Sequence, residues 1–580
     1  MRPRGRPPLF RLRSAGERAV YVDPLDARGQ PLGPSPATAR LLAAWARALE
    51  PPPAGVEAVL RGYATLYLEL DPRQASEAEL FRRLDRLLAE AGAAGDGGQA
   101  PRFVELPVLY GGEAGPDLEA VARETGRTPE EVVRLHSSRT YHALALGFSP
   151  GFAYLGELPA ELEVDRLPRP RERVPAGSVA IAGRQTAVYP SATPGGWRLI
   201  GRCPLPLLLP GEEPPVRIRL GDRVRFRPVD AGEFRRLEAE ARAPRPAPAA
   251  GGEAGAEAAV EVVRPGFLTS VQDLGRPAWR GYGFVEAGAL DRAALMAANA
   301  LVGNEPGAAG LEMTVAGPVL RFLRPLAIAL AGADLGAELD GLRLEPGRAV
   351  QVRPGQLLRF RGRRRGARAY LALEGGIDLP APGGSRSTDL VAGVGGLGGR
   401  PLGAGDRLRT GGAGSRRPLA PEEVARLLPP LPEPGRPLAV RVTLGPDDDL
   451  FAPGALEALA GLAWRLSPAS NRTGMRLEGG RLDFLPEAQG ALAGRSLSEP
   501  VAAGAVQVPP GGEPILLLAD RPTIGGYARI ATAIEADLDR LAQLAPGDLL
   551  RMLPVSPEAA RAADRRRRAE MEALRGREAG

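Results

Sequence analysis

The chain has 580 residues, a length that predicts two to four domains, and its 75 basic and 69 acidic residues leave a formal net charge of +6. Every basic residue other than two histidines is arginine. The absence of lysine excludes a P-loop lysine, a Schiff-base lysine and a biotinyl-lysine on this chain. Two histidines exclude a three-histidine zinc site, and the single Cys203 excludes an internal disulfide.

The composition favours a turn-rich β protein. Glycine and proline number 75 and 60 and would break long helices, so we expect a mainly β fold with minor α content. No apolar stretch approaches the roughly 20 residues that span a bilayer, and no apolar segment follows the first arginines. The basic excess gathers near the two ends without the interleaved aromatic residues of nucleic-acid readers. We therefore expect a soluble cytoplasmic protein that binds neither membrane nor nucleic acid.

One shift in composition divides the chain. Residues 242–259 contain alanine, proline and glycine but no aromatic or β-branched residue, so they cannot bury enough surface to order themselves and are predicted to be a linker. The sequence thus predicts a first module over residues 1–241 and a second over residues 260–555. Residues 556–580 are predicted to form a charged, solvated helix and tail.

Helices are predicted to be a minority. Residues 128–131 read Thr-Pro-Glu-Glu, with a capping threonine, a proline at the first helical position and acids in the first turn. The predicted helices span residues 80–90, 116–124, 129–138, 233–241, 289–302, 421–428 and 534–544.

A local pattern recurs in both modules. A Gly-Asp or Gly-Gln turn followed by alternating apolar and polar residues begins at Gly221, Gly355, Gly405 and Gly547. This alternation is the signature of a half-buried strand. The recurrence indicates related β-barrel units along the chain, although turn-strand units resemble one another in many proteins.

Two segments of the first module are dense in glycine, proline and aromatic residues. They cover residues 136–156 and 174–201. Such a composition fixes backbone N–H groups and flat aromatic faces around a concave spot, which suits a small polar ligand. A glycine- and proline-rich hairpin packed with aromatic residues would have the same composition.

These segments, with Tyr110 to Leu118, resemble the first subunit of the allophanate hydrolase/5-oxoprolinase family, which is also known through the sporulation-kinase inhibitor KipI. The resemblance covers nearly all of residues 10–230. The second module resembles the other subunit of the same family. Its matching stretches are residues 265–276, 288–291, 298–304, 311–314, 332–334, 375–378, 384–390, 470–474, 498–501 and 520–527. The resemblance implies a natural fusion of two subunits and a fold of tandem cyclophilin-like β-barrel domains.

Candidate functional residues follow from these motifs. An arginine fork suits a carboxylate or phosphate, and a carboxylate can hold Mg²⁺ or move a proton. The predicted catalytic residues are His136, Asp273, Arg276 and Asp520. The predicted substrate- or nucleotide-binding residues are Gly151, Phe152, Tyr154, Gln185, Thr186, Gly195, Gly196, Trp197, Arg386, Asn471, Arg472, Thr523, Gly526 and Tyr527. No residue is assigned as a metal ligand.

The sequence departs from the family pattern at four positions. Pro522 stands where the family usually has glutamine, Ile524 where it has threonine, Met475 where it has tyrosine, and Cys203 where it has threonine or serine. The loss of an amide and of hydroxyl groups near a candidate pocket bears on substrate identity more than on the fold.

The resemblance implies an ATP-dependent 5-oxoprolinase component, using ATP and Mg²⁺, with no biotin attached to this chain. In the family, phosphorylation belongs to these two subunits and ring opening to a separate one of the LamB/YcsF type, which we expect as a partner in an oligomer. Two alternatives stay open at this point. One is the carboxyltransferase part of a biotin-dependent urea carboxylase/allophanate system, and the other is a KipI-like inhibitor of a histidine kinase.

Overall fold

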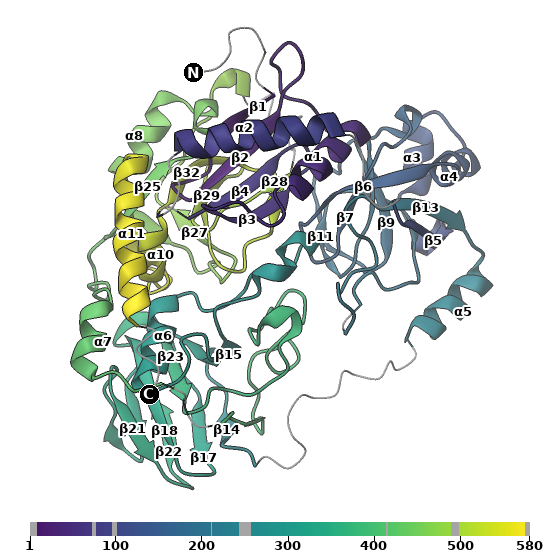
Figure 1. Ribbon diagram of the computed structural model, residues 1–580. Coiled ribbons are helices and arrows are strands. Elements are labelled where there is room, and N and C mark those ends of the chain that lie inside the picture. The colour runs from purple at the N-terminus through teal and green to yellow at the C-terminus, as the bar shows by residue number, and fades with distance from the viewer. Residues whose placement is uncertain are drawn as a thin grey trace.

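The computed structural model describes residues 9–71, 73, 77–94, 101–209, 211–242, 257–412, 414, 416–488 and 498–574. Strands dominate it and helices make up 24%, as the composition predicts. The described residues form four units, two from each predicted module (Figure 1). Each module contains one closed barrel of seven strands.

The N-terminal unit is a four-stranded antiparallel sheet covered on one face by two helices (Figure 1). The strand order is β1 (Phe10–Ser14), β2 (Ala19–Pro24), β4 (Leu66–Leu70) and β3 (Val56–Arg61), and the helices are α1 (Pro36–Ala48) and α2 (Glu77–Ala94). Phe10, Trp45 and Leu84 lie in the core between sheet and helices. Tyr21 and Tyr67 point from the opposite face of the sheet and pack with Ala502 of the second module. One face of this sheet therefore packs in the core of the N-terminal unit, and the other face contacts the second module.

The first barrel follows directly along the chain. Its strands are β5 (Phe103–Tyr110), β6 (Thr140–Leu146), β7 (Ala153–Gly156), β9 (Ser178–Ala182), β10 (Gln185–Val188), β12 (Arg198–Arg202) and β13 (Arg223–Pro228). The short strands β8 (Arg171–Val174) and β11 (Thr193–Gly195) pair with each other outside the barrel. In β13, Val224 and Phe226 are buried, whereas Arg223 and Arg225 are exposed, so the alternation of the sequence sets which face is inside. Helices α3 (Leu118–Glu124), α4 (Pro129–Ser137) and α5 (Ala231–Arg242) complete the unit, and Thr128 and Glu131 form the predicted capping box of α4.

The second module begins with two antiparallel sheets. One has the order β20-β19-β22-β17-β14-β24 and the other the order β15-β16-β23-β18-β21. Helix α6 (Arg292–Leu301) packs on β18 and β23 and is buried on nearly all sides, because it is rich in alanine. The strands are β14 (Val260–Arg264), β15 (Leu268–Gln272), β16 (Gly310–Thr314), β17 (Val319–Phe322), β18 (Leu326–Asp334), β19 (Ala337–Leu339), β20 (Leu342–Arg343), β21 (Ala349–Val352), β22 (Leu357–Phe360), β23 (Arg365–Leu373) and β24 (Arg407–Leu408).

The second barrel repeats the connectivity of the first. Its strands are β25 (Leu438–Leu444), β26 (Trp464–Leu466), β27 (Gly474–Glu478), β29 (Ala505–Val508), β30 (Ile515–Leu517), β32 (Ala528–Ala533) and β33 (Leu549–Pro554), with β28 (Glu499–Pro500) and β31 (Ile524–Gly525) paired outside. In both barrels the last strand in sequence runs parallel to the first and closes the ring. The turns at Gly221 and Gly547 each open that last strand, whereas the turns at Gly355 and Gly405 open β22 and β24 of the six-stranded sheet. The predicted recurrence of barrel units is thus confirmed for two of the four turns.

Helix α11 (Pro557–Ala573) is not the solvated helix that its charges predict. Asp564 is fully buried and Arg567 is 8% exposed, and Arg567 pairs with Asp539 of α10 (Glu535–Leu541) at 2.6 Å. Arg568 pairs with Glu57 of the N-terminal sheet at 2.7 Å. Figure 1 shows α11 in yellow running from α7 (Pro421–Leu427) up to α8 (Pro453–Gly461). Charged residues therefore tie the end of the chain to both modules.

The two modules meet through a buried ionic network around Tyr21. The guanidinium groups of Arg13 and Arg529 lie 4.8 and 4.9 Å from the centre of its ring. The Tyr21 hydroxyl accepts a hydrogen bond from Arg529 and donates one to the carbonyl of Pro500, each at 2.5 Å. Arg529 also pairs with Asp447 at 2.7 Å and with Glu499. Arg13 of the N-terminal sheet pairs with Glu499 of the second module at 2.5 Å, so the charges of one module are neutralised partly by the other.

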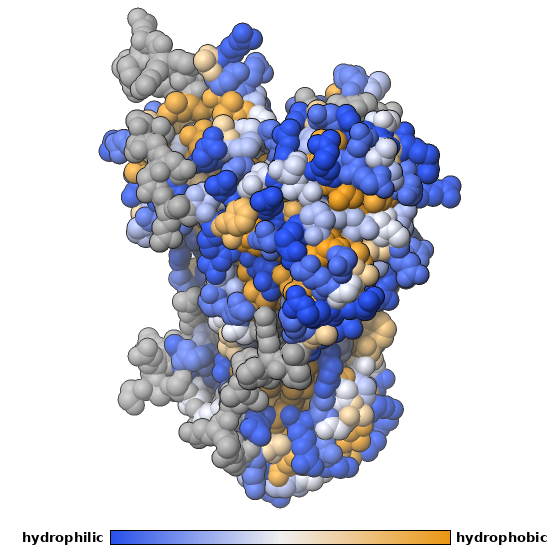
Figure 2. Space-filling view, turned by 90° about the vertical axis from the view of Figure 1, so that its right-hand side faces the viewer, coloured by the Kyte–Doolittle hydropathy of each residue, from blue (hydrophilic) through white to orange (hydrophobic). Residues whose placement is uncertain are grey.

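The predicted linker falls largely outside the described residues, between the end of α5 at Arg242 and the start of β14 at Val260. Polar and charged residues cover most of the face that the first barrel presents in Figure 2. Among the described residues, no helix combines the length and apolar character needed to cross a bilayer.

We expect residues 1–242 and 257–580, expressed as two chains, to associate into one complex. Arg529→Ala should weaken this complex at least tenfold, because it removes the hydrogen bond from Arg529 of the second chain to the buried Tyr21 hydroxyl of the first, and the contact of its guanidinium with the Tyr21 ring. Size-exclusion chromatography and titration of one labelled chain with the other would measure this. Arg321→Ala, which removes a surface pair with Glu261, is the matched control. Two soluble chains that never elute together would contradict the account.

Candidate functional site

The glycine-rich loops of the first barrel reach the second module. Gly147, at the end of β6, packs so closely that a Cβ atom there would lie 2.4 Å from Cγ1 of Ile524. The Gly151 N–H donates to the carbonyl of Tyr282 at 2.9 Å. Between them, Phe148 has φ = 72°, a left-handed conformation that is strained for a bulky residue, and its side chain is 41% exposed. The motif segments of the two modules therefore form one junction.

Three of the eight binding residues predicted in the first module, Phe152, Tyr154 and Trp197, pack in an aromatic cluster that reaches this junction. Phe152 lies edge-on to Tyr154, Tyr189 and Trp197, with ring centroids 4.9 to 5.9 Å apart. Ile524 belongs to the same cluster, so the isoleucine that departs from the family pattern completes an apolar contact. A Cβ at Gly195 would overlap the Tyr189 ring. The ligand-binding role predicted for Gly151, Phe152, Tyr154, Gly195, Gly196 and Trp197 stays a prediction, and the structure gives these residues a packing role.

His136 is fully buried inside the first barrel. Its Nδ1 lies 2.7 Å from the Tyr110 hydroxyl and its Nε2 lies 2.8 Å from Thr186 Oγ1, and its ring stacks on Phe226 at 4.5 Å. Because Thr186 donates its own proton to the carbonyl of Ala180, Nε2 carries the hydrogen and Nδ1 accepts from Tyr110. Burial lowers the pKa of His136 to about 3, so the ring is neutral. This geometry favours a structural role for His136 and Thr186, while Gln185 stands beside them at the start of β10.

Asp273, Ser385 and Ser387 form a closed hydrogen-bonded cluster in the second module. The Asp273 carboxylate accepts from both serine hydroxyls, at 2.6 and 2.5 Å, and from the backbone of Gly275 and Arg386, at 2.8 and 2.6 Å. The hydrogen-bonding capacity of this carboxylate is thus used within the protein, and Asp273 is only 8% exposed to solvent.

Arg276 lies in the same cluster and is fully buried. Its guanidinium donates to the carbonyls of Pro382, Ser385 and Ser387, and its Nη1 is buried without a partner among the described residues. Arg386 points away and pairs with Asp378 at 3.1 Å. The structure brings Asp273, Arg276 and the 385–387 segment together, and their contacts hold a loop in place. The catalytic role predicted for Asp273 and Arg276 stays a prediction.

Arg472 links Asp520 to Glu312. It forms a two-bond contact with the Asp520 carboxylate at 2.9 and 3.0 Å, and its third nitrogen contacts Glu312. It also donates to the carbonyl of Gly288 at 2.6 Å, while Glu312 accepts from the Leu290 N–H at 3.0 Å. All three charges are buried, so they fix the 288–290 backbone rather than reach solvent.

The remaining predicted residues lie in or near turns. Asn471 accepts from the N–H groups of Thr473 and Gly474 at 2.9 and 3.2 Å. The Thr523 hydroxyl is buried without a partner in the described part of the chain. Gly526 and Tyr527 are exposed.

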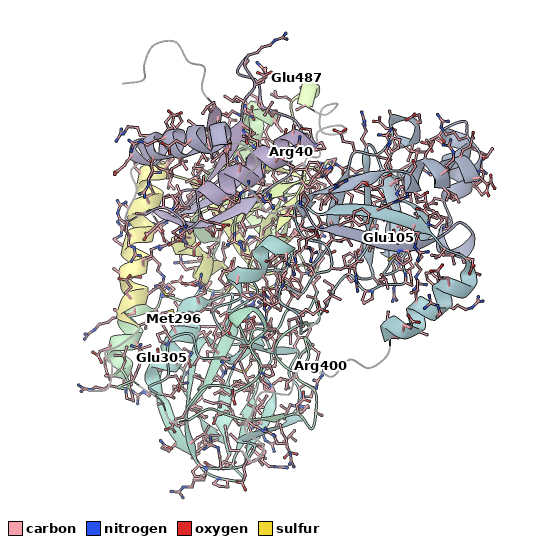
Figure 3. The ribbon with its side chains drawn as sticks, turned by 45° about the vertical axis from the view of Figure 1, so that its right-hand side comes forward. Arg40, Glu105, Met296, Glu305, Arg400 and Glu487 are labelled. Atoms are coloured by element: carbon pink, nitrogen blue, oxygen red, sulfur yellow. The ribbon has the colours of Figure 1, made fainter. Side chains whose placement is uncertain are left out.

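A cavity of about 720 Å³ opens between the two modules, next to these clusters. Its walls come from the β1–β2 turn, β3 and β4 of the N-terminal sheet, and from the 274–290 segment, α6, β32, α10 and α11 of the second module. Met296 and Glu305, two of the lining residues, lie near the lower end of α11 in Figure 3. This volume suits a small ligand or a nucleotide. We call this cavity the intermodule cleft.

Acidic and arginine side chains line the intermodule cleft in nearly equal numbers. The acids are Glu17, Glu57, Glu69, Glu286, Glu305, Glu535, Asp539, Asp564 and Glu572, and the arginines are Arg18, Arg73, Arg280, Arg292, Arg416, Arg521, Arg567 and Arg568. Arg280 binds both oxygens of Glu69 at 2.8 and 2.6 Å. Burial acts to raise the pKa of Glu69, but this arginine outweighs it and holds the pKa at about 2. Arg521 donates to the carbonyl of Val501, and within the described residues its one carboxylate neighbour at ion-pair distance is Glu286, at 3.8 Å.

None of the predicted site residues lines the intermodule cleft, but their sequence neighbours do. Leu274 and Pro277 flank Asp273 and Arg276, and Arg521 follows Asp520. The predicted residues of the second module therefore lie directly behind the residues that line the intermodule cleft. The lining residues Glu17 and Glu69 carry no motif signal, because they belong to an ordinary turn and an ordinary strand. Only the packing of the modules brings them to the cleft.

Two family models match the chain. "Carboxyltransferase domain, subdomain C and D" matches residues 10–218, and "Carboxyltransferase domain, subdomain A and B" matches residues 282–554. The intermodule cleft lies between these two matched regions. The two halves of a carboxyltransferase-type unit thus stand in one chain.

Known proteins resemble each half. The C subunit of the 5-oxoprolinase from Escherichia coli strain K12 is 38% identical over 301 residues, which cover 52% of this chain and 93% of the relative. The B subunit of the 5-oxoprolinase from E. coli O157:H7 is 54% identical over 131 residues, 23% of this chain and 60% of the relative, so the match spans less than two thirds of that protein. The urea amidolyase of Saccharomyces cerevisiae is 32% identical over 52% of this chain and 17% of its own length.

A solved structure matches nearly the whole chain. The crystal structure of TTHA0988 is 36% identical and covers 92% of this chain and 99% of its own, with a TM-score of 0.75. The chain therefore belongs to the carboxyltransferase-domain family that includes the B and C subunits of 5-oxoprolinase, with the B-like part fused ahead of the C-like part.

We expect His136→Ala to lower the free energy of unfolding by about 2 to 4 kcal/mol, because it leaves a cavity and strands the hydroxyls of Tyr110 and Thr186. His142→Ala, at a half-buried strand position, is the matched control and should cost less than about 1 kcal/mol. Denaturant unfolding measures both. A stable His136 variant that has lost its activity would instead support the catalytic role that the sequence predicts.

Proposed function

We propose that this chain is the ATP-dependent component of a 5-oxoprolinase, which phosphorylates 5-oxo-L-proline in the intermodule cleft. The observation that carries this proposal is a charged cleft built jointly by a region like the B subunit of that enzyme and a region like its C subunit. The names of the relatives support the choice of substrate.

The cleft offers groups suited to both substrates. Arg521 has a guanidinium with only a loose carboxylate contact, and Arg292 is exposed, so each can take the carboxylate of 5-oxoproline or the phosphates of ATP. No group of three or more histidine, cysteine or acidic residues is placed to hold a metal within the described ranges. Mg²⁺ would therefore enter with the nucleotide and need few protein ligands, as is usual for this ion.

The chemistry addresses the stability of the lactam. Amide resonance makes a five-membered lactam a poor electrophile. Phosphorylation of its carbonyl oxygen makes the ring carbon a better electrophile. Water can then add to this carbon and the C–N bond can break, and a second water releases the phosphate, which leaves glutamate. A separate LamB/YcsF-type protein, the A subunit of the enzyme, would perform that second step in an oligomer with this chain.

The buried clusters have a place in this proposal as positioning groups. Asp273 and Arg276 hold the segments next to Leu274 and Pro277, while Arg472, Asp520 and Glu312 hold the backbone of Leu290. Rigid walls keep the substrates in a reactive arrangement, and such positioning can supply a large part of the rate enhancement.

The second candidate is the carboxyltransferase component of a biotin-dependent urea carboxylase. It is favoured by the match to urea amidolyase and by the name of the family domain. Because the chain has no lysine, biotin would have to arrive on another protein.

The two candidates differ in their requirements. Purified chain mixed with a LamB/YcsF-type protein, Mg-ATP and 5-oxoproline should release glutamate and ADP together, and avidin should have no effect. The chain alone should release no glutamate. Consumption of urea and bicarbonate with a biotinylated carrier, with 5-oxoproline left intact, would support the second candidate instead. Tight binding to a histidine kinase with neither substrate consumed would support the inhibitor role.

The same assay tests the cleft. Arg521→Gln should raise the KM for 5-oxoproline or ATP at least tenfold, because it removes a charge-assisted contact. Arg321→Gln, at a surface pair remote from the lining residues, is the control. An unchanged KM for both substrates in the Arg521 variant would place the reaction outside this cleft.

A further inference from the structure

Glu17 occupies a distinctive position in the intermodule cleft. It lies in the turn between β1 and β2, which crosses from the N-terminal sheet to the second module, where Gly16 packs against Thr532. Glu17 is only 4% exposed to solvent, and it lines both the intermodule cleft and a second cavity of about 130 Å³. Glu17 thus lies between the cleft and a small cavity with a mainly apolar lining, whose polar lining residues also include Ser14, Asp71 and Arg561.

The carboxyl of Glu17 has one strong contact. Its Oε1 accepts a hydrogen bond from the N–H of Glu535, the first residue of α10, at 2.7 Å. Within the described residues, no arginine lies at ion-pair distance from it. The guanidinium of its neighbour Arg18 pairs instead with Glu57, Glu535 and Asp564.

Burial without an ion pair raises the pKa of Glu17 to about 7, and the nearby Glu535 and Asp564 carboxylates act in the same direction. The cations that face this region are Arg441 on β25, Arg18 on the same turn, and Arg561 and Arg568 on α11. Glu69, on the same cleft, has its pKa held at about 2 by Arg280. Two glutamates of one site therefore differ in proton affinity, a pattern typical of acid–base chemistry.

We propose that Glu17 is the general base of the cleft and accepts the N–H proton of the lactam during phosphorylation. This inference rests on the proposed function. As the lactam oxygen attacks the γ-phosphorus of ATP, the O–P bond forms and the bond from phosphorus to the ADP oxygen breaks. The nitrogen loses its proton to Glu17, the C–N bond becomes a C=N bond and the C=O bond a C–O bond, which gives an O-phosphorylated cyclic imidate with a neutral nitrogen, ADP and protonated Glu17.

The second cavity completes the cycle. Its volume is enough for about four water molecules, at roughly 30 Å³ each. Because Glu17 lines both spaces, the proton it gains on the cleft side can leave on the other side, past Asp71, without crossing the bound substrate.

Glu17 also caps α10, so a purely structural role has to be separated from proton transfer. Glutamine keeps a carbonyl oxygen that accepts the Glu535 N–H but cannot take a proton at neutral pH. Glu17→Gln is therefore the informative change. Glu261→Gln, a surface glutamate paired with Arg321, is the matched control.

In the complete mixture with the LamB/YcsF-type protein, Mg-ATP and 5-oxoproline, the wild-type rate of ADP release should rise with pH and level off above about 7. Glu17→Gln should lower this rate by about 100-fold or more and abolish the rise, since general bases contribute that much. Glu261→Gln should leave rate and pH profile unchanged. A Glu17→Gln enzyme with the wild-type pH profile overturns the inference while the proposed function stands. A wild-type mixture without turnover overturns both.

Thermal unfolding supplies a readout that needs no substrate. The pKa of Glu17 is about 7 in the folded protein and about 4.5 in the unfolded chain, so protonated Glu17 stabilises the fold at low pH. This contribution to stability is lost as pH rises from about 4.5 to about 7. The wild type should therefore lose Tm relative to Glu17→Gln across this window. A difference that stays constant with pH shows that Glu17 does not titrate there, and also overturns the inference.

Discussion

Charges that are buried on both sides of the module boundary govern this structure. Arg529 reaches Tyr21 of the N-terminal sheet, and Arg280 of the second module binds Glu69 of that sheet with two hydrogen bonds. A buried charge without its partner costs several kcal/mol, so the Arg280–Glu69 pair favours the docked arrangement of the two modules. The cleft exists only in the docked arrangement, and fusing the modules in one chain keeps both halves at equal concentration.

The same boundary explains how one cleft holds groups of different proton affinity. Glu69 contacts an arginine of the other module, which keeps its carboxylate ionised. Glu17 contacts only a backbone N–H of the other module, so the effect of burial dominates and its pKa rises. The repeated barrels behind these walls supply rigidity, and Arg472 and Asp273 lock the loops between wall and barrel. The contacts that hold the two modules together thus also set the pKa values of the glutamates in the cleft.

Local signals in the sequence predicted much of the fold. The capping residues before α4 and the alternation in β13 and β33 depend on neighbours in sequence, and the structure has these elements where they were expected. Helix α1 was not predicted, although Ser35 and Pro36 begin it. Helix α11 was expected to be solvated, because Glu57 and Asp539, the partners of its arginines, lie far away in sequence. The glycine-rich motifs pointed to Asp273 and Arg276, which the structure places in one cluster with Ser385. Their inward hydrogen bonds, and the lining role of Glu17, depend on packing that no local pattern encodes.

The central claim, that the intermodule cleft is the reaction site, is tested most directly by a crystal structure of the chain with 5-oxoproline and a non-hydrolysable ATP analogue. The account predicts density for both ligands between the β1–β2 turn, Arg292 and Arg521, with the lactam nitrogen within hydrogen-bond distance of Glu17. Ligand density inside either barrel, or around Phe152 and Trp197 with the cleft empty, would contradict it.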